Sequence, residues 1–319
     1  MIEFYKTTDE GTVQIENLEP GCWVNVMRPS SEERTWLLDD LEIAPEFIRS
    51  ALDDEESPHT DFDDDTRQVL VILDCASIED RAETVDDTIV QYDTQPLAFL
   101  IVPEKECIVT LSLVPNETVR LFTTKRLRKL DTENRTDMML QMMLHVSQQY
   151  LVCLRNIHRQ FIKNEKELHR TMRNKELIKM LGFEKSLVYF STSLKADDAV
   201  LQKLNTGRVV KLDSDDRDVL EDVTIEIRQA MEMSSIYATI LNGSMETFGT
   251  VISNNLNLTM RTLTAMALVL AIPTIIFSFY GMNVAILPLD QTWIWPVLMA
   301  VGVSVVSAVV LWARKFFIK

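Results

Sequence analysis

Apolar residues are concentrated near the end of this 319-residue chain, in two runs without a charged side chain, residues 263–280 and 293–312. A helix needs roughly 20 apolar residues to cross a hydrocarbon core of about 30 Å, so each run predicts a membrane span. Two buried core helices are the alternative. Aromatic side chains that gather at membrane interfaces stand at the ends of the runs: Tyr280, Trp293, Trp295 and Trp312. We therefore predict spans over residues 261–280 and 293–313.

Positive charges flank the two predicted spans on one side only. They precede the first span and follow the second: Arg261, Arg314, Lys315 and Lys319. The connecting loop, residues 281–292, carries a single charged residue, Asp290. Because positively charged flanks stay in the cytoplasm, we expect both chain ends there, including the basic tail 314–319, and the loop outside. No secretory or organelle-targeting pattern opens the chain, which favours a prokaryotic plasma membrane.

The first part of the chain alternates strand-like and helix-like patterns. Short stretches rich in apolar and β-branched residues predict strands over 22–26, 68–73, 89–92, 97–102 and 107–113. Two stretches with helical spacing predict helices, over 31–41 with a Ser-x-x-Glu start and over 45–52. We expect these elements to form a cytoplasmic α/β domain over residues 1–118.

A long helical region follows, because no proline occurs between Pro115 and Pro273. We predict a cytoplasmic helical hairpin, coiled-coil-like, over residues 119–209. A stalk helix over 210–280 would then continue into the first membrane span. Its continuous helical pattern, which begins at Asp216, has about 60 residues and a length of about 90 Å at 1.5 Å per residue. Its weak points are two glycines, Gly243 and Gly249.

One face of the predicted stalk helix is small and polar, both below the membrane and inside it. Its residues recur at a spacing of three or four: Ser235, Thr239, Asn242, Glu246, Gly249 or Thr250, Ser253, Asn257, Met260, Thr264, Ala267, Ala271, Thr274 and Ser278. Inside a membrane, such a stripe is also typical of close helix packing. Its continuation into polar positions below the membrane favours the wall of a water-filled tube. One helix cannot enclose a tube, so the pattern predicts a homo-oligomer.

Charge and metal-binding residue types narrow the function. The formal net charge of −16 lies almost wholly before the first span. Nucleic acid is excluded as a partner because its phosphates need a basic face, whereas an acidic surface suits cations. The four cysteines form no C-x-x-C pair, which indicates reduced thiols. Three histidines lack the i, i+4 spacing of a metal pair and are interpreted as packing or surface residues: His145, His158 and His169.

The tetrapeptide Tyr280-Gly281-Met282-Asn283 closes the first predicted span, just before the short loop. In this place, after a long helix and an acidic α/β domain, it resembles the CorA family of magnesium transporters. Residues 52–58, with the sequence LDDEESP, are similar to the family segment before its second core strand. The order of the predicted elements resembles the family over the whole chain. Individual residues resemble it from about Asn257 to the end. It implies a funnel-shaped homopentamer whose first span lines the pore and whose second span packs outside.

The resemblance also assigns residues to the pore. The selectivity filter would be Gly281, Met282 and Asn283. With the stripe, the pore lining would comprise Asn257, Met260, Leu263, Ala267, Ala271, Thr274 and Ser278. Met260 and Leu263 are candidate hydrophobic gates that close by dewetting. Ala271 stands where relatives often carry a bulkier residue, so the constriction there is expected to be wider or to lie elsewhere.

Neutral oxygens at the filter suit Mg²⁺, which sheds its water reluctantly and is usually held through its hydration shell. A ring of Asn283 amides and Gly281 carbonyls could accept hydrogen bonds from the hydrated ion, whereas a carboxylate ring would release it slowly. We expect Gly281 to adopt a left-handed conformation that ends the helix and frees its last carbonyls. Mg²⁺ would be both the transported and the regulatory ion, without an organic cofactor.

The resemblance further implies that carboxylates between neighbouring cytoplasmic domains sense intracellular Mg²⁺. Asp222 matches by its distance from the motif, with Glu221 beside it, and Asp53 or Asp54 would supply the other side. Bound ions would favour the closed state, and repulsion between the bare carboxylates would favour opening. A solvated acidic surface is the alternative for each. Asp290 lies one position beyond the usual loop acid, so it would recruit external cations weakly.

Three other functions remain open. Transport of Co²⁺, Ni²⁺ or Zn²⁺ is the first, although a zinc-transporting branch of the superfamily tends to have isoleucine where this chain has Met282. A membrane-anchored sensor that conducts nothing is the second, and it would need neither the stripe nor the motif. An enzyme is the third and is not expected, because the sequence has no nucleotide loop, nucleophile elbow or clustered metal ligands.

Overall fold

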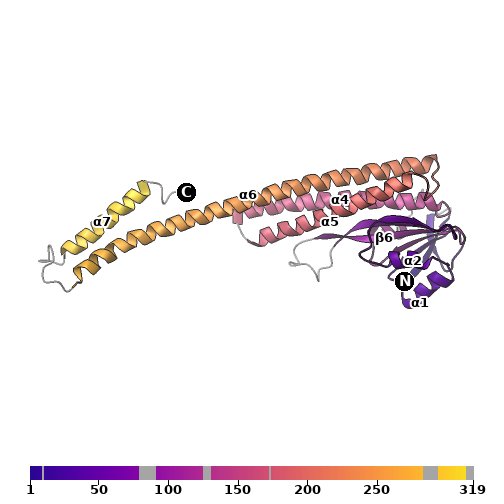
Figure 1. Cartoon of the computed structure of the whole chain (residues 1–319), viewed down its shortest axis with the longest axis horizontal. Helices are drawn as coiled ribbons and strands as arrows, with labels where there is room; N and C mark the ends of the chain where they lie inside the picture. Colours follow the sequence, from indigo (N-terminus) through magenta and orange to yellow (C-terminus); the bar gives the residue numbers. More distant parts are fainter. Residues whose placement is uncertain (9–10, 79–90, 125–130, 172–173, 283–293, 314–319) are drawn as a thin grey trace. The chain divides into compact units, whose positions relative to one another are not determined.

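The computed structural model of this chain describes residues 1–8, 11–78, 91–124, 131–171, 174–282 and 294–313 (Figure 1). The chain divides into two compact units, Met1–Gly243 and Ser244–Lys319. Each unit is described separately below. The first holds a β-sheet and most of the helices, and the second holds two apolar helical segments.

A seven-stranded sheet forms the centre of the first unit, with the order β2-β1-β3-β7-β6-β5-β4. Its strands are β1 (Ile2–Thr8), β2 (Gly11–Ile15), β3 (Trp23–Met27), β4 (His59–Phe62), β5 (Val69–Ile78), β6 (Tyr92–Val102) and β7 (Cys107–Ser112). Only β3 and β7 pair in parallel, in the register Trp23↔Ile108. The other pairs are antiparallel, and β5 and β6 form the longest of them, from Val69↔Ile101 to Ile78↔Tyr92.

The expected α/β fold is confirmed, with differences at the edges of the sheet. Strands predicted at 22–26, 68–73, 97–102 and 107–113 correspond to β3, β5, β6 and β7. The predicted strand 89–92 falls partly on residues 89 and 90, which lie outside the described residues. Strands β1, β2 and β4 were not predicted. The outermost strands, β2 and β4, are short and only partly buried, so their sequences lack the apolar runs of the central strands.

Two short helices, α1 (Ser31–Asp39) and α2 (Pro45–Ala51), pack on one face of the sheet. The Ser-x-x-Glu start is confirmed as a capping box, in which Ser30 Oγ accepts a hydrogen bond from the Glu33 amide at 3.2 Å and Glu33 Oε2 accepts one from the Ser30 amide at 2.7 Å. Side chains at alternating strand positions, such as Leu70 and Ile72, meet Leu37 and Phe47 in this core.

The short helix α3 (Glu117–Thr124) follows, and then two long helices, α4 (Arg135–Thr171) and α5 (Asn174–Asn205). The pair α4 and α5 packs on β5 and β6 (Figure 1). Tyr150 of α4 and Phe190 of α5 are buried there, with their ring centroids 5.1 Å apart and nearly perpendicular planes. The central strands are therefore covered on both faces, which explains their nearly continuous apolar sequence.

The long helix predicted from the proline-free sequence is confirmed as α6, Ser214–Tyr280, with 67 residues. It begins at a reciprocal cap in which the Asp216 amide donates to Asp213 Oδ1 at 2.8 Å and the Asp213 amide donates to Asp216 Oδ2 at 3.1 Å. The helix runs unbroken through Gly243 and Gly249, the two expected weak points. Within the first unit, it contacts α4 where His158 stacks on Tyr237, with centroids 4.4 Å apart.

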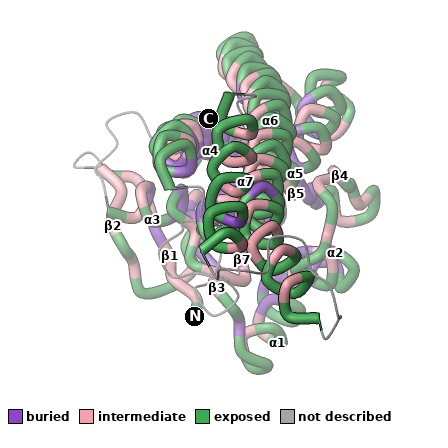
Figure 2. The backbone as a smooth tube through the Cα atoms, turned by 90° about the vertical axis from the view of Figure 1, so that its left-hand side faces the viewer, coloured by how far each residue is buried: buried purple, intermediate pink, exposed green. Residues whose placement is uncertain are grey.

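The second unit holds the last part of α6 and helix α7 (Ile294–Ala313). By length and composition, α6 and α7 can each cross a membrane. Ala265 of α6 and Ala300 of α7 are the fully buried side chains among the described residues of these apolar segments. Most other side chains on α7 are exposed in the single chain (Figure 2). A helix this apolar and this exposed requires lipid or other protein around it.

Candidate pore-lining helix

The residues predicted to line a pore lie on the exposed part of α6. Met260 and Leu263 have exposed fractions of 54% and 59% in the single chain. The other members of the set are exposed as well: Asn257, Ala267, Ala271, Thr274 and Ser278. No contact with α7 covers any of these side chains, so the whole set is available to face water or another copy of the chain.

The side of α6 that is covered in the second unit is a different one. Its buried or half-buried residues recur at helical spacing: Thr262, Ala265, Val269, Ile272 and Ile276. At about 100° per residue, the centre of the predicted pore stripe lies roughly 160° around the helix from the centre of this covered side. On α7, Ala300 is buried and Ser304 is half-buried, so this helix also has a covered side with small residues. The stripe and the α7 contact thus occupy nearly opposite sides of α6.

Hydroxyl groups on the exposed side of α6 bond to their own helix. Thr264 Oγ1 donates to the Met260 carbonyl at 2.8 Å, and Thr274 Oγ1 donates to the Leu270 carbonyl at 3.2 Å. This bonding uses the hydrogen of each hydroxyl and leaves oxygen lone pairs directed outward. The hydroxyl groups of the stripe are therefore hydrogen-bond acceptors without formal charge. Such acceptors can bond to the water shell of a cation but do not bind the cation tightly.

Gly281 does not have the left-handed conformation that we expected, because its backbone φ is not positive. Its amide still donates to the Phe277 carbonyl at 2.9 Å, so the helical bonding continues through the glycine. A Cβ at this position would lie 3.2 Å from the Phe277 carbonyl oxygen, closer than normal side-chain contacts. Glycine is thus favoured here because the Phe277 carbonyl lies close to it. That carbonyl stays hydrogen-bonded within the helix and is not free to bind an ion.

Two predicted residues lie outside the described part of the chain. Asn283, the amide of the predicted filter, and Asp290, the loop acid, fall within residues 283–293. Met282 is described and is 49% exposed, directly after the end of α6. The motif therefore begins at the exposed end of the helix that carries the stripe, and the roles of Asn283 and Asp290 stay predictions.

The predicted regulatory acids are all exposed, in two places in the first unit. Asp53 and Asp54 follow the end of α2, where Asp53 Oδ1 accepts a hydrogen bond from the Glu55 amide at 3.0 Å. Glu221 and Asp222 lie near the start of α6. Among the described residues of one chain, no group of three or more His, Cys, Asp or Glu side chains could hold a metal ion. A site made from these acids would need more than one copy of the chain.

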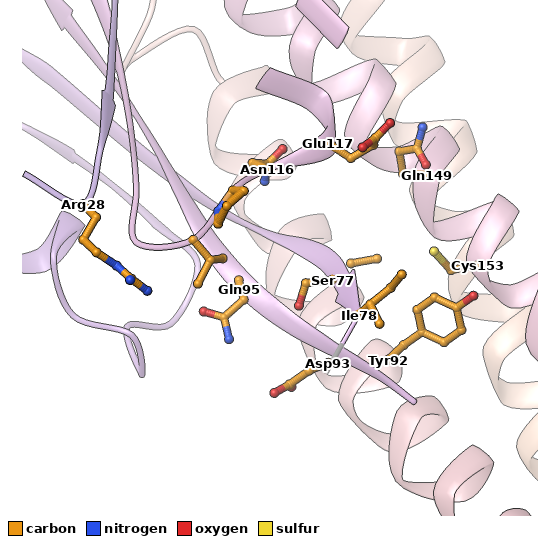
Figure 3. A pocket seen from close by; sticks show the side chains of 13 residues that line it. Arg28, Ser77, Ile78, Tyr92, Asp93, Gln95, Asn116, Glu117, Gln149 and Cys153 are labelled. Carbon is orange, nitrogen blue, oxygen red and sulfur yellow. The ribbon is translucent and has the colours of Figure 1, made fainter. Parts of the chain in front are cut away.

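The first unit also contains a cavity of about 820 Å³ at the end of the β5–β6 hairpin where Ile78 pairs with Tyr92 (Figure 3). Tyr92 and Asp93 of β6, Asn116 before α3, and Gln149 and Cys153 of α4 are among the residues that line it. Burial raises the pKa of the Cys153 thiol to about 12, so this cysteine is not an activated nucleophile. The cavity therefore gives no support to the enzyme alternative.

Histidines in the helices take part in packing, as interpreted from their spacing. His158 lies between Phe161 and Tyr237, and its ring is within 5° of parallel to that of Tyr237. His145 contacts Phe122, with ring centroids 6.2 Å apart, and its Nε2 is 3.0 Å from Gln149 Nε2. Neither contact resembles a metal ligand set.

Comparison with known proteins gives relatives along nearly the full chain. The cobalt/magnesium transport protein CorA of Methanocaldococcus jannaschii is 26% identical over 288 residues, which are 89% of this chain and 87% of that protein. The complete structure of the CorA magnesium transporter from the same organism matches with a TM-score of 0.79 and 21% identity, over 100% of this chain and 98% of that chain. The full-length CmaX structure matches with a TM-score of 0.67 and 14% identity, over 98% of this chain and 96% of that chain.

The two structural likenesses show a shared fold that includes the α/β unit, the long helices and the two apolar C-terminal helices. A family model described as CorA-like Mg²⁺ transporter protein matches residues 19–315, which include the sheet from β3 onward, all seven helices and the Gly-Met-Asn motif. Because that match spans nearly the whole sequence, the chain belongs to the family of CorA-like Mg²⁺ transporter proteins.

Proposed function

We propose that this chain is one subunit of a homopentameric channel that carries divalent cations, with Mg²⁺ as the preferred ion. The observation that carries the proposal is the exposed stripe of α6 from Asn257 to Ser278, whose members carry no charge. It lies opposite the covered side of the helix and is followed by Gly281-Met282. The name of the relative from Methanocaldococcus jannaschii supports Mg²⁺ and Co²⁺ as the ions to consider. The channel would lie in a prokaryotic plasma membrane with both chain ends in the cytoplasm.

An arrangement with α6 inside and α7 outside follows from the two sides of α6. If the stripe faces the axis of a ring of subunits, the opposite side of α6 faces outward, where α7 packs on it. Exposed valines of α7, such as Val305 and Val306 at 56% and 61%, then meet lipid. The reverse arrangement would turn the polar side chains of Asn257, Thr274 and Ser278 away from water, which is unfavourable.

At the outer end, a ring of Asn283 amides would select the ion. Neutral amide oxygens hydrogen-bond to the water shell of Mg²⁺ and leave the ion free to move on, because no carboxylate replaces its waters. Deeper in the pore, rings of Met260 and Leu263 would form the gate. Apolar rings of this kind block ions by excluding water when they are narrow.

The experiment that tests this function measures ion flux into liposomes that contain the purified full-length protein. Mg²⁺, Co²⁺, Ni²⁺ and Zn²⁺ are compared with ion-selective dyes, with protein-free liposomes as the baseline. We expect Mg²⁺ flux, and we expect Asn283→Ala to abolish it. Asn254→Ala is the matched control, because this exposed amide of α6 lies off the stripe, and its flux should equal that of the wild type.

Each other outcome of the flux experiment contradicts part of the proposal. Flux of Zn²⁺ or Co²⁺ without Mg²⁺ would assign a different ion. An absence of flux for all four ions would favour the non-conducting sensor. Unchanged flux in Asn283→Ala would remove the amide ring as the filter and leave the ion pathway to be located elsewhere.

We also propose that intracellular Mg²⁺ closes the channel at Asp222, with Glu221 beside it and Asp53 or Asp54 from a neighbouring copy. All four acids are exposed in the single chain and free to meet another subunit. Asp222→Ala should raise the internal Mg²⁺ concentration that half-inhibits flux by at least about fivefold, the lower end of typical coupling between sites. Flux is measured against internal Mg²⁺, with the exposed turn acid Glu104→Ala as the control. Unchanged inhibition would exclude Asp222.

A further inference from the structure

Three polar contacts join α5 to the β5–β6 hairpin. Ser186 Oγ accepts a hydrogen bond from the Tyr92 amide at 2.9 Å, and Ser193 Oγ donates to Thr94 Oγ1 at 2.8 Å. Asp197 Oδ1 accepts a hydrogen bond from the Asp74 amide at 3.0 Å. Ser186, Ser193 and Asp197 are seven and four residues apart, so they lie on one face of α5. Asp197 is thus a structural contact between this helix and the sheet.

Asp197 is completely buried, with an exposed fraction of 0%. Its second carboxylate oxygen, Oδ2, has no hydrogen-bond partner among the described residues. The same is true of the hydroxyl of Tyr150, which is also 0% exposed. A buried carboxylate that is ionised and has an oxygen without a partner is destabilised by several kcal/mol or more, so such groups usually gain a proton or a cation.

The groups around Asp197 are acidic or neutral on each element that packs against it. Strand β5 contributes Asp74 and Cys75, α4 contributes Tyr150, and β6 contributes Asp93, which acts on Asp74. On α5 itself, Asp198 is paired with Arg228 of α6, with Arg228 Nε 3.1 Å from Asp198 Oδ1, and Lys195 is exposed. Among the described residues, no basic side chain is one of the groups that act on Asp197 or Asp74.

We propose that the buried Asp197 and the half-buried Asp74 form a proton-binding pair, and that its proton makes the packing of α5 on the β5–β6 hairpin sensitive to pH. When Asp197 is protonated, it keeps its hydrogen bond with the Asp74 amide and carries no charge in its buried position. Loss of the proton leaves negative charge between α5 and the sheet, where the surroundings are apolar and the neighbouring acid repels it. The neutral pair was not predicted, because Asp197 lies in a charged stretch that is typical of a solvated helix face.

The expected direction of the pH dependence follows from burial. Burial, and then the charge of Asp74, raise the pKa of Asp197 well above its usual range, and burial also raises the pKa of Asp74. A raised pKa in the folded state means that stability is fully present below the unfolded pKa of about 3.9 and is lost as pH rises through the folded pKa. The first unit should therefore become less stable as pH rises toward neutral.

Asp197→Asn tests the pair, because asparagine has nearly the same shape and keeps an oxygen for the Asp74 amide. Thermal unfolding of the full-length protein in detergent is followed from pH 5 to pH 8. For each proton that the pair holds, the unfolding equilibrium constant of the wild type should rise up to about tenfold per pH unit, and Asp197→Asn should lack this part of the slope. Asp218→Asn, an exposed acid of α6, should retain the wild-type slope.

An infrared measurement reports the proton directly and does not depend on ion flux. At pH 7, the wild type should show the carbonyl stretch of a neutral carboxylic acid, and Asp197→Asn should lose it. The proposal is overturned if that band is unchanged in the variant, or if the wild type and Asp197→Asn unfold with the same pH dependence. If Asp197→Asn does not fold, the infrared band of the wild type still tests the proposal. This band must be present at pH 7, and it must decline at higher pH together with the thermal stability.

Discussion

Modification of a cysteine placed at Ala271 with a cationic thiol reagent is expected to abolish Mg²⁺ flux. Ala271 is exposed and lies in the middle of the stripe, away from the side of α6 that contacts α7. If the stripe lines the pore, the reagent places a fixed positive charge beside the path of a divalent ion. At a separation of about 5 Å and an effective dielectric constant of about 20, the repulsion is roughly 6 kcal/mol, which corresponds to more than a thousandfold lower flux.

The matched control for this experiment is Met266→Cys. Met266 is 51% exposed on the same stretch of α6, but it lies about 140° around the helix from position 271, outside the stripe. Its modification should leave flux unchanged. Native thiols give little background, because Cys22, Cys75 and Cys107 are buried and burial raises the pKa of Cys153 to about 12. Equal block at both positions, or none at position 271, would contradict the assignment of the pore-facing side.

Gly281→Ala is expected to reduce Mg²⁺ flux by at least about fivefold, because overpacking typically costs 1–3 kcal/mol. The added methyl group would lie 3.2 Å from the Phe277 carbonyl oxygen, which belongs to the backbone and cannot rotate away. Relief requires the end of α6 to shift, and this shift moves Met282 and the residues after it. Flux into liposomes is measured together with thermal unfolding of the purified variant.

Gly302→Ala distinguishes this local effect from a general sensitivity of the apolar helices. A Cβ at Gly302 of α7 would meet no atom within 4 Å in the chain, so flux and stability should stay close to those of the wild type. If Gly281→Ala conducts normally, the conformation at the end of α6 is not what positions the filter. A lower unfolding temperature of Gly281→Ala would instead indicate that the substitution changes the structure beyond the end of α6.

The exposed apolar surface of α6 supports the proposal that the working unit is an oligomer. Large apolar side chains such as Leu263 and Leu268, with exposed fractions of 59% and 55%, surround α6 in its apolar part. If some of these exposed side chains of α6 line a pore, only the remaining ones can face lipid. In the proposed oligomer, the covered side of α6 would face outward and the stripe would face the axis.

The sequence determined the features that depend on local periodicity and composition. The apolar runs identified both C-terminal helices, and the absence of proline before Pro273 identified the continuous helix α6. Central strands such as β5 and β7 were predicted because both of their faces are buried and their residues are nearly all apolar. The motif at Gly281-Met282-Asn283 and its place in the chain indicated the family, since a layout of this kind is visible without coordinates.

Only the tertiary structure decided which side chains meet. Strands β2 and β4 are edge strands that form by pairing with β1 and β5, and their own short and partly exposed sequences do not specify a strand. The helical bonding of Gly281 depends on the Phe277 carbonyl, although glycine alone is equally compatible with a left-handed end. The sequence around Asp197 is typical of a solvated helix face. Its side chain is nevertheless buried and bonds to the Asp74 amide, because α5 packs on the hairpin. Burial and contact between distant segments are properties of the folded chain, so neither can be derived from the spacing of residues along it.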